Sequence, residues 1–405
     1  MSAVCFYFQV HQPYRVDKYR VFDIGKKHDY FSGREENDLN NQRILLKVAN
    51  KCYLPANSLL LQLINKHPEF KVSFSLSGVL LEQLEEFSPE TLDSFRRLVD
   101  TGRVEILSET YYHSLSYIFS PDEFSRQVKM HSQKIKELFS VEPTVFRNTE
   151  LIYNNDLARH IENLGYKGII AEGADHVLGW RSPNFLYHPA GCESLKLLLK
   201  NFRLSDDIAF RFSTPDWKEF PLMAPKFAKW VSDHNGAGDI INLFMDYETM
   251  GEHQWATTGI FDFFRHLPGE ILKHPDNYFI TPSEAVAKLP AVGELDIPNF
   301  MSWADVERDL SAWLGNPMQD DSIAKLYEME KAVLKSGDTA LISDWSKLTT
   351  SDHFYYMCTK YFADGDVHKY FNPYNSPYEA FISYMNVLSD LKLRLSAHAE
   401  NTRPK

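Results

Sequence analysis

Short apolar runs alternate with helix-like patterns over the first 280 residues, and this alternation constrains the fold more than any other feature. Several of the runs are apolar on both faces, which is typical of strands buried inside a parallel sheet. The runs are Val4–Val10, Val72–Leu76, Val104–Leu107, Val145–Phe146, Gly168–Ala171, Leu195–Leu199 and Ile240–Met245. Strands that alternate with helices predict an α/β fold, and about seven of them predict a parallel sheet that closes into a barrel.

Helix starts lie between these runs, and the character of the chain changes after about residue 285. The segments Ser120–Glu123 and Thr281–Glu284 are capping boxes, in which a hydroxyl and a carboxylate satisfy the first backbone N–H groups of a helix. Beyond residue 285, Ile323–Leu334 and Tyr378–Leu395 have helical spacing, and strand signals are scarce. We therefore expect a barrel over residues 1–285, followed by a C-terminal helical region over residues 286–405 packed on the barrel.

Charge, cysteine usage and hydropathy exclude several classes of protein. The chain has 43 Lys and Arg residues against 55 Asp and Glu residues, a net charge of −12, which disfavours binding of nucleic acid. The four cysteines form no closely spaced pairs, so neither a disulfide framework nor a zinc knuckle is expected. No run approaches the length of a membrane span, and the N-terminus lacks the basic residues of a signal peptide. We expect a cytoplasmic protein without a membrane partner.

Polar and aromatic residues follow the predicted strands, where barrel enzymes carry their chemistry. These residues are His11, Gln12, Glu105, Glu109, His113, Arg147, Asn148, Glu150, Glu172, Trp180, Asp246, Glu248, His253 and Trp255. Each has an ordinary structural explanation when taken alone, such as a core tryptophan or a carboxylate at a helix start. Their convergence on one edge of a barrel predicts an active site.

Two of these strand-end carboxylates suit glycoside hydrolysis, which needs one carboxyl group on each side of the scissile bond. Arg147 precedes Glu150 by three residues and would keep it ionised as a nucleophile. Asp246 ends an apolar run and lies near Glu248 in sequence. Burial and a neighbouring like charge would both favour its protonated form, which an acid catalyst needs.

Four short motifs, taken in order, resemble the signature regions of glycoside hydrolase family 57. They are His11–Pro13, Gly102–Glu105, Phe146–Leu151 and Asp246–His253, and the later stretch Ser302–Asn316 resembles the α-amylase-like members of that family. The resemblance implies an incomplete (β/α)7 barrel followed by helices, with retaining action on α-glucans. It also implies Glu150 as the nucleophile and Asp246 as the acid/base. Gln9 departs from the family pattern, because many members have a histidine at this position.

The remaining candidates would line the sugar site. By resemblance and by position after a strand, the expected substrate-binding residues are His11, Gln12, Glu105, His113, Arg147, Trp180, Glu248, His253, Trp255, Trp303, Asp352 and His353. Asp352 and His353 lie in the segment Asp344–Tyr356, which would form either a wall of the sugar site or a packed helix interface. The expected partner is an α-glucan or maltooligosaccharide, and the sequence indicates no particular oligomeric state.

Alternative functions stay open at this point. A 4-α-glucanotransferase forms the same covalent intermediate as a hydrolase and passes the sugar to a hydroxyl group instead of water. Branching activity ranks below it, because no long insertion suits branch formation. Related metal-dependent barrels place His-x-Asp after the first strand, whereas this chain has His11-Gln12-Pro13, so we expect no catalytic metal and no cofactor. An inactive glucan-binding protein is a further alternative.

Overall fold

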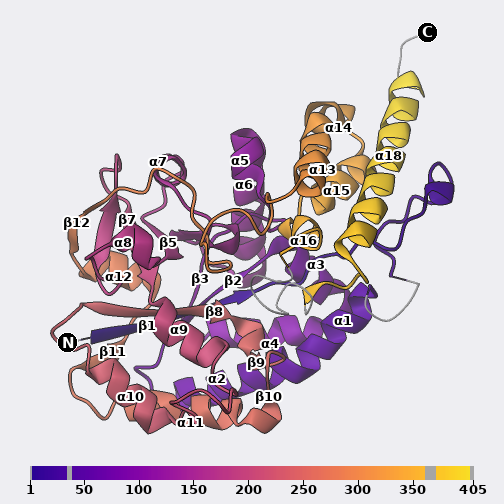
Figure 1. Cartoon of the computed structure of the whole chain (residues 1–405). Helices are drawn as coiled ribbons and strands as arrows, with labels where there is room; N and C mark the ends of the chain where they lie inside the picture. The colour runs from indigo at the N-terminus through magenta and orange to yellow at the C-terminus, as the bar shows by residue number, and fades with distance from the viewer. Residues whose placement is uncertain (1, 34–38, 361–370, 402–405) are drawn as a thin grey trace. The chain divides into compact units, whose positions relative to one another are not determined.

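The computed structural model describes residues 2–33, 39–360 and 371–401. Its strands are β1 (Ser2–Val10), β2 (Val72–Leu76), β3 (Val104–Ile106), β4 (Val145–Arg147), β5 (Gly168–Glu172), β6 (Leu186–Pro189), β7 (Lys196–Lys200), β8 (Ile240–Asp246), β9 (Met250–Gly251), β10 (Gln254–Trp255), β11 (Asn277–Phe279) and β12 (Ala291–Leu295). Each predicted apolar run therefore forms a strand, namely β1 to β5, β7 and β8. The five others were not predicted (Figure 1).

Helices connect these strands and make up most of the C-terminal part. The α-helices are α1 (Asn41–Val48), α2 (Leu54–Lys66), α3 (Gly78–Phe87), α4 (Pro89–Val99), α5 (Ser116–Phe119), α6 (Pro121–Phe139), α7 (Asn155–Asn163), α8 (Asp175–Leu178), α9 (Phe202–Ala209), α10 (Ala224–Ser232), α11 (Ile260–Ile271), α12 (Pro282–Lys288), α13 (Pro317–Glu328), α14 (Glu330–Ser336), α15 (Thr339–Leu348), α16 (Ser351–Tyr355) and α18 (Pro377–Asn401). The short 3₁₀ helices are η1 (Val21–Asp23), η3 (Thr149–Leu151), η4 (Tyr247–Thr249) and η5 (Ala256–Thr258), and η2 (Ala49–Tyr53) is a π-helix.

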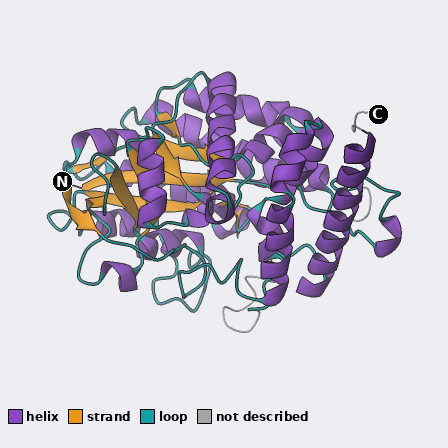
Figure 2. Ribbon diagram, turned by 90° about the horizontal axis from the view of Figure 1, so that it is seen from above, coloured by secondary structure: helices purple, strands orange, loops and turns teal. Residues whose placement is uncertain are grey.

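Seven parallel strands form an incomplete barrel, which confirms the predicted fold class. Strand β1 pairs with β2 and β8, β2 pairs with β3, and β5 pairs with β4 and β7. Backbone hydrogen bonds connect the remaining neighbours, β3 with β4 and β7 with β8. The carbonyl oxygen of Ser108, just after β3, accepts a hydrogen bond from Arg147 N of β4 at 2.8 Å, and Asn201 N, just after β7, donates to Asn242 O of β8 at 2.9 Å. Figure 2 shows the strands gathered together with helices around them.

Side chains alternate between the inside and the outside of the barrel, as the period of two in a strand requires. In β1, Cys5 and Tyr7 point into the core, whereas Phe6 and Phe8 point outward and each contacts Phe264 of α11 with ring centroids 6.3 Å apart. The buried interior cluster also contains Ala3, Leu107, Val145, Ile170, Leu198, Ile240 and Phe244. The apolar interior therefore contains residues from the barrel strands β1, β4, β5, β7 and β8, and it fixes which residue at each strand end faces inward.

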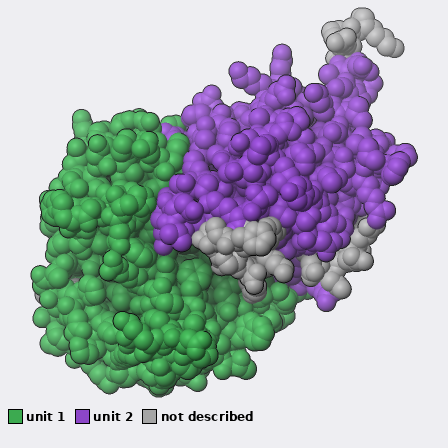
Figure 3. All heavy atoms as spheres, viewed as in Figure 1, with its two compact units in different colours: residues 1–11, 46–109, 129–303 green, residues 12–45, 110–128, 304–405 purple. Residues whose placement is uncertain are grey.

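The chain divides into two compact units (Figure 3). Unit 1 comprises residues 1–11, 46–109 and 129–303, and it holds the barrel. Unit 2 comprises residues 12–45, 110–128 and 304–405. The boundary expected at residue 285 stays a prediction, because a compact unit is not by itself an independently folding domain.

Unit 2 is built mainly from α13 to α16 and α18, with α18 packing on α13, α14 and α15. Residues 12–45 belong to this unit. They are tied to α18 because its buried Asp390 accepts hydrogen bonds from Tyr30 Oη at 2.5 Å and Gly25 N at 2.6 Å. The helix predicted over Ile323–Leu334 is in fact divided between α13 and α14. Among the described residues, no helix combines the length and the apolar character that crossing a bilayer requires.

Candidate active site

Polar side chains form the uppermost interior layer of the barrel, at the carboxyl ends of its strands. Each follows an inward apolar or aromatic residue by two positions, so strand geometry turns it toward the same space. The layer contains Gln9 of β1, Glu109 after β3, Arg147 of β4, Glu172 of β5, Lys200 of β7 and Asp246 of β8. All six belong to unit 1. This layer is the candidate active site.

Asp246 and Glu109 both lie close to Gln9 and Tyr7 of strand β1. Asp246 lies opposite Gln9 in the register of β1 and β8, and Gln9 Nε2 donates to Glu109 Oε1 at 3.4 Å. Tyr7, one layer below, donates its hydroxyl to Gln9 Oε1 at 2.7 Å. Burial raises the pKa of Tyr7, which also feels the charges of Arg147, Glu109 and Asp246. Tyr7 is therefore a neutral hydrogen-bond donor beneath a charged layer.

Glu150 follows β4 on a sharp turn with unusual backbone geometry. It lies in η3 with φ 55° and ψ 26°, and the next residue, Leu151, has φ 50°. Left-handed conformations cost non-glycine residues about 1–2 kcal/mol each, so the surroundings must impose this turn. Asn148 helps to do so, because its Nδ2 donates to Ile152 O at 3.0 Å across the turn.

Trp303 holds Glu150 through two hydrogen bonds. Its backbone N–H donates to Glu150 O at 3.2 Å, and its indole Nε1–H donates to the carboxylate oxygen Oε2 at 2.7 Å. The segment before Trp303 is anchored beside the turn, because Met301 and Tyr153 exchange backbone hydrogen bonds of 2.9 Å in both directions. A residue 153 positions along the chain thus fixes the orientation of this carboxylate.

Two cationic side chains contact the indole ring of Trp303. The guanidinium carbon of Arg147 and the ammonium nitrogen of Lys200 are each 5.3 Å from the ring centroid, within cation–π range. Lys200 is only 4% exposed and has two carboxylate partners, Asp206 at 3.0 Å and Glu172 at 3.5 Å. Buried charges need such partners, and these contacts leave the ammonium group fixed against the ring.

Arg147 has an acidic partner that the sequence did not suggest. Its guanidinium group forms a salt bridge with Glu109 at 3.9 Å, and both of these side chains are fully buried. Arg147 reaches Glu150 through Trp303, whose ring it contacts. A series of contacts through Gln9, Glu109, Arg147 and Trp303 therefore connects the neighbourhood of Asp246 with Glu150. Such a layer can orient two carboxylates around one bond.

Two other predicted residues lie on the barrel strands or just beyond them. His11 follows β1, and its Nδ1 is 2.6 Å from Ser77 Oγ. Glu105 is in the middle of the short strand β3, where its Oε2 accepts hydrogen bonds of 2.9 Å from both the backbone N–H and the hydroxyl of Ser283 in α12. Burial raises the pKa of Glu105. These contacts give Glu105 a role in fixing the start of α12.

Hydrogen bonds and a salt bridge hold the loop that follows Asp246 against η2 and α1. Glu248 accepts a hydrogen bond from Tyr53 of η2, and Cys52 Sγ donates to Tyr247 O at 3.1 Å. Glu252 pairs with Lys47 at 2.7 Å. The neighbouring predicted residue, His253, is not fully buried, yet burial of its ring lowers its pKa to about 4, so it is neutral near pH 7.

Two predicted tryptophans lie apart from this polar layer. Trp180 follows α8, is 89% exposed and contacts the guanidinium group of Arg181 at 5.3 Å from its ring centroid. Trp255 of β10 is 61% exposed and has the ammonium group of Lys51 at 5.9 Å from its ring centroid. Trp255 borders a groove between α2 and α11, which none of the residues of the uppermost layer lines.

The other predicted residues, Gln12, His113, Asp352 and His353, belong to unit 2. Gln12 accepts a hydrogen bond from Arg15 at 3.0 Å. His113 is buried with φ 52°, and its carbonyl accepts a hydrogen bond from Ser351 N at 2.9 Å, next to Asp352. His353 is buried, and its Nε2 lies 3.2 Å from Lys347 O. Its ring packs against Tyr384, with ring centroids 5.6 Å apart.

Lys200 is the residue that the sequence analysis missed, and Gln9, Glu109 and Glu172 were noted without a role. A signal for all four was present, because each lies two positions after an inward residue: Tyr7, Leu107, Ile170 or Leu198. Taking every second residue along each strand, starting from the inward apolar residue, would have identified them. The contact between Trp303 and Glu150 had no such signal, since it spans 153 positions.

Comparison with known proteins identifies the family of the chain. The model of the family described as "Glycosyl hydrolase family 57" matches residues 5–298, which carry β1, β4, β8 and the layer of polar residues. The chain belongs to this family. A protein of Methanocaldococcus jannaschii named "Putative alpha-amylase" is 44% identical over 400 residues, which is 96% of this chain and 84% of that protein.

Two solved structures share the fold. The GH57-type branching enzyme of Pyrococcus horikoshii superposes with a TM-score of 0.70 at 14% identity, over 100% of this chain and 92% of the other. The 4-alpha-glucanotransferase of Thermococcus litoralis gives 0.68 at 16% identity, over 87% of this chain and 56% of the other. The protein is therefore an enzyme of a carbohydrate-active family, with the general glycoside hydrolase or transferase activity of that family.

Proposed function

We propose that this protein is a retaining α-amylase-type enzyme, which hydrolyses α-1,4-glucosidic bonds with Glu150 as nucleophile and Asp246 as acid/base. The observation that carries the proposal is the placement of Glu150. It combines a left-handed turn after β4, an indole N–H bound to Oε2, and two buried cations against that indole. A carboxylate held in this way is preorganised for attack.

In the proposed mechanism, Asp246 donates its proton to the glycosidic oxygen while a carboxylate oxygen of Glu150 attacks the anomeric carbon. The leaving chain departs and a glycosyl ester forms on Glu150. Asp246, now ionised, removes a proton from a water molecule, which attacks the anomeric carbon and releases Glu150. Trp303 orients the nucleophile, and Gln9 lies beside Asp246 in the sheet register. Two successive inversions at the anomeric carbon give net retention.

The name of the Methanocaldococcus jannaschii relative favours hydrolysis. Transfer to a second glucan is the competing outcome, because it uses the same glycosyl ester and differs only in the acceptor. The two solved structures belong to transferring enzymes, and their fold is compatible with both outcomes. A binding protein without activity is the third possibility, although both carboxylates are present in this chain.

Product analysis on maltoheptaose tests the proposal. Shorter oligosaccharides with a matching gain in reducing ends support hydrolysis, and a mixture of shorter and longer products without that gain indicates a transferase. Glu150→Gln should abolish either reaction while leaving thermal unfolding unchanged. Asp246→Asn should regain formation of the glycosyl ester, seen as a burst of released leaving group, on a glucoside whose leaving group needs no protonation, while hydrolysis of the ester stays slow without the base. A folded Glu150→Gln variant with the turnover of the parent would refute the assignment of the nucleophile.

A further inference from the structure

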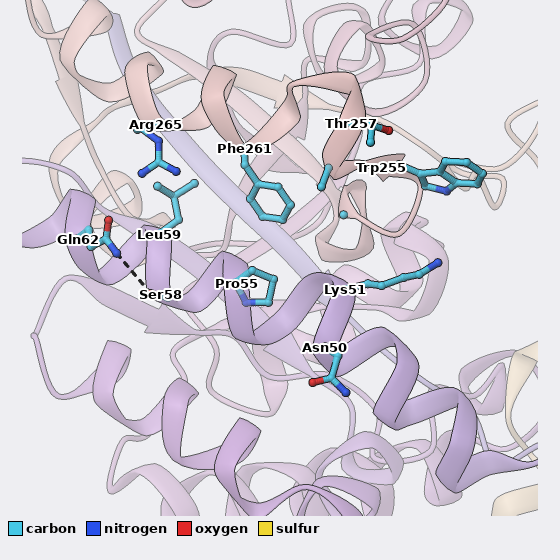
Figure 4. Close-up of a pocket in the computed structure, with 12 residues that line it drawn as sticks. Asn50, Lys51, Pro55, Ser58, Leu59, Gln62, Trp255, Thr257, Phe261 and Arg265 are labelled. Atoms are coloured by element: carbon cyan, nitrogen blue, oxygen red, sulfur yellow. Dashed lines mark hydrogen bonds between the residues drawn. The ribbon is translucent and has the colours of Figure 1, made fainter.

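A groove lies on the outside of the barrel between α2 and α11, and its lining residues take no part in the proposed mechanism. It has a volume of about 760 Å³. One wall comes from η2 and α2 and the other from β9, β10, η5 and α11. Its lining residues are Asn50, Lys51, Pro55, Ser58, Leu59, Gln62, Gly251, Trp255, Ala256, Thr257, Phe261 and Arg265. Figure 4 shows Phe261 facing Pro55 across the groove, with Trp255 beyond Lys51 at one end.

The floor and the rim of the groove differ in chemistry. Leu59, Pro55 and Phe261 supply a buried or half-buried apolar floor. The rim carries neutral hydrogen-bonding side chains that are exposed, namely Asn50, Ser58, Gln62 and Thr257. Small-molecule sites in proteins combine an apolar surface with a few polar groups in this way, and the volume lies within their usual range.

The charges around the groove are compensated by the protein itself. Lys51 Nζ lies 3.4 Å from the carboxylate of Glu252, and Arg265 Nε lies 3.5 Å from that of Asp262. Burial alone would raise the pKa of Glu252, but Lys47 and Lys51 lower it further than burial raises it, so this carboxylate stays charged. A groove whose cations already have carboxylate partners does not select a charged ligand.

Trp255 gives the groove a flat apolar face at its mouth. The indole is 61% exposed, and its position next to an apolar floor distinguishes it from a solitary surface aromatic. A pyranose ring presents an apolar C–H face to such an indole and its hydroxyl groups to a neutral polar rim. The combination of exposed indole, neutral donors and compensated charge therefore matches an uncharged polyhydroxylated chain.

We propose that this groove is a second glucan-binding site, which holds an α-glucan chain away from the catalytic carboxylates. The choice of ligand rests on the proposed function, since it takes the enzyme's own substrate class. The groove also adjoins the loop that starts at Asp246. A Cβ on Gly251 would lie 2.1 Å from Lys51 O, so loop and η2 are in direct contact where the groove begins. A chain bound there is retained beside the catalytic unit between cleavage events.

Affinity electrophoresis in gels that contain glycogen tests the site without any need for turnover. The protein is the full chain with Glu150→Gln, to which Trp255→Ala or Ser58→Glu is added, so that opposite walls are altered separately. Phe22→Ala on η1 is the control, because Phe22 is also an exposed aromatic residue, at 78%. Trp255→Ala should raise the dissociation constant for glycogen about 2- to 12-fold, the value of one aromatic contact. Ser58→Glu should also raise it, and Phe22→Ala should leave it unchanged.

The proposal is overturned if both groove variants bind glycogen as tightly as the Glu150→Gln protein. It is also overturned if a mixed-linkage β-glucan retards the protein equally and in a Trp255-dependent way, or if Trp255→Ala alters only the sedimentation of the protein, which would make the groove a contact between copies. Failure of the proposed function gives a different result. A parent protein that leaves maltoheptaose intact, but whose glycogen binding depends on Trp255, would refute the amylase assignment and support the groove.

Discussion

Replacing Trp303 with phenylalanine removes one hydrogen bond from the catalytic carboxylate and keeps the aromatic ring. The bond lost is the 2.7 Å contact from the indole Nε1–H to Glu150 Oε2. A hydrogen bond to a charged group is worth about 1.5–3 kcal/mol, which at 1.36 kcal/mol per tenfold in rate predicts a fall in kcat of roughly 10- to 150-fold. KM should change by less than about threefold, because the phenyl ring still faces Arg147 and Lys200.

Initial rates on maltoheptaose, followed through new reducing ends, measure this effect. Trp230→Phe is the matched control, because Trp230 on α10 is also half-buried and has the ammonium group of Lys226 at 5.6 Å from its ring centroid. It should retain the kcat of the parent. A Trp303→Phe enzyme within about threefold of the parent kcat would refute the positioning role. A raised KM at constant kcat would instead assign the indole to sugar binding.

Two further substitutions test the buried charges and the neutral histidine. Lys200→Met leaves the carboxylates of Glu172 and Asp206 without their cation, so urea unfolding should show a loss of about 3–5 kcal/mol. Adding Glu172→Gln should restore part of that loss, and a loss below about 1 kcal/mol would contradict the buried ion pairs. His253, with a pKa of about 4 in the folded protein, stays neutral where the unfolded chain is protonated, so stability should fall as the pH drops from about 6.5 to 4. His253→Gln should remove up to about 3 kcal/mol of that pH dependence, and identical urea midpoints against pH in both proteins would show that His253 does not titrate in this way.

The barrel could be predicted from the sequence because its strands carry their own signal. Runs such as Val72–Leu76 and Ile240–Met245 are short, apolar on both faces and separated by helix starts, and a parallel sheet covered by helices is the fold that satisfies them. The polar layer follows from the same pattern. Lys200 illustrates this. It lies two positions after the inward-facing Leu198 in β7, and strand periodicity alone turns its side chain inward.

Contacts between distant segments could not be predicted in this way. Trp303 reaches Glu150 because Met301 pairs with Tyr153, and no local pattern near residue 303 encodes that pairing. The salt bridge between Arg147 and Glu109 was missed for a related reason, since the two residues are far apart in sequence and the barrel brings them together. Short-range charge patterns point only to residues nearby in sequence, such as Glu150.

In the proposed mechanism, Glu150 forms the covalent bond to the substrate. A 5-fluoro-α-glucosyl fluoride slows hydrolysis of the glycosyl ester more than its formation, so the intermediate accumulates and can be located by peptide mass spectrometry. We expect one added fluoroglucosyl group, attached to the peptide that contains Glu150 and absent from the Glu150→Gln protein. A label on a different carboxylate, or a product released with the opposite anomeric configuration, would contradict it.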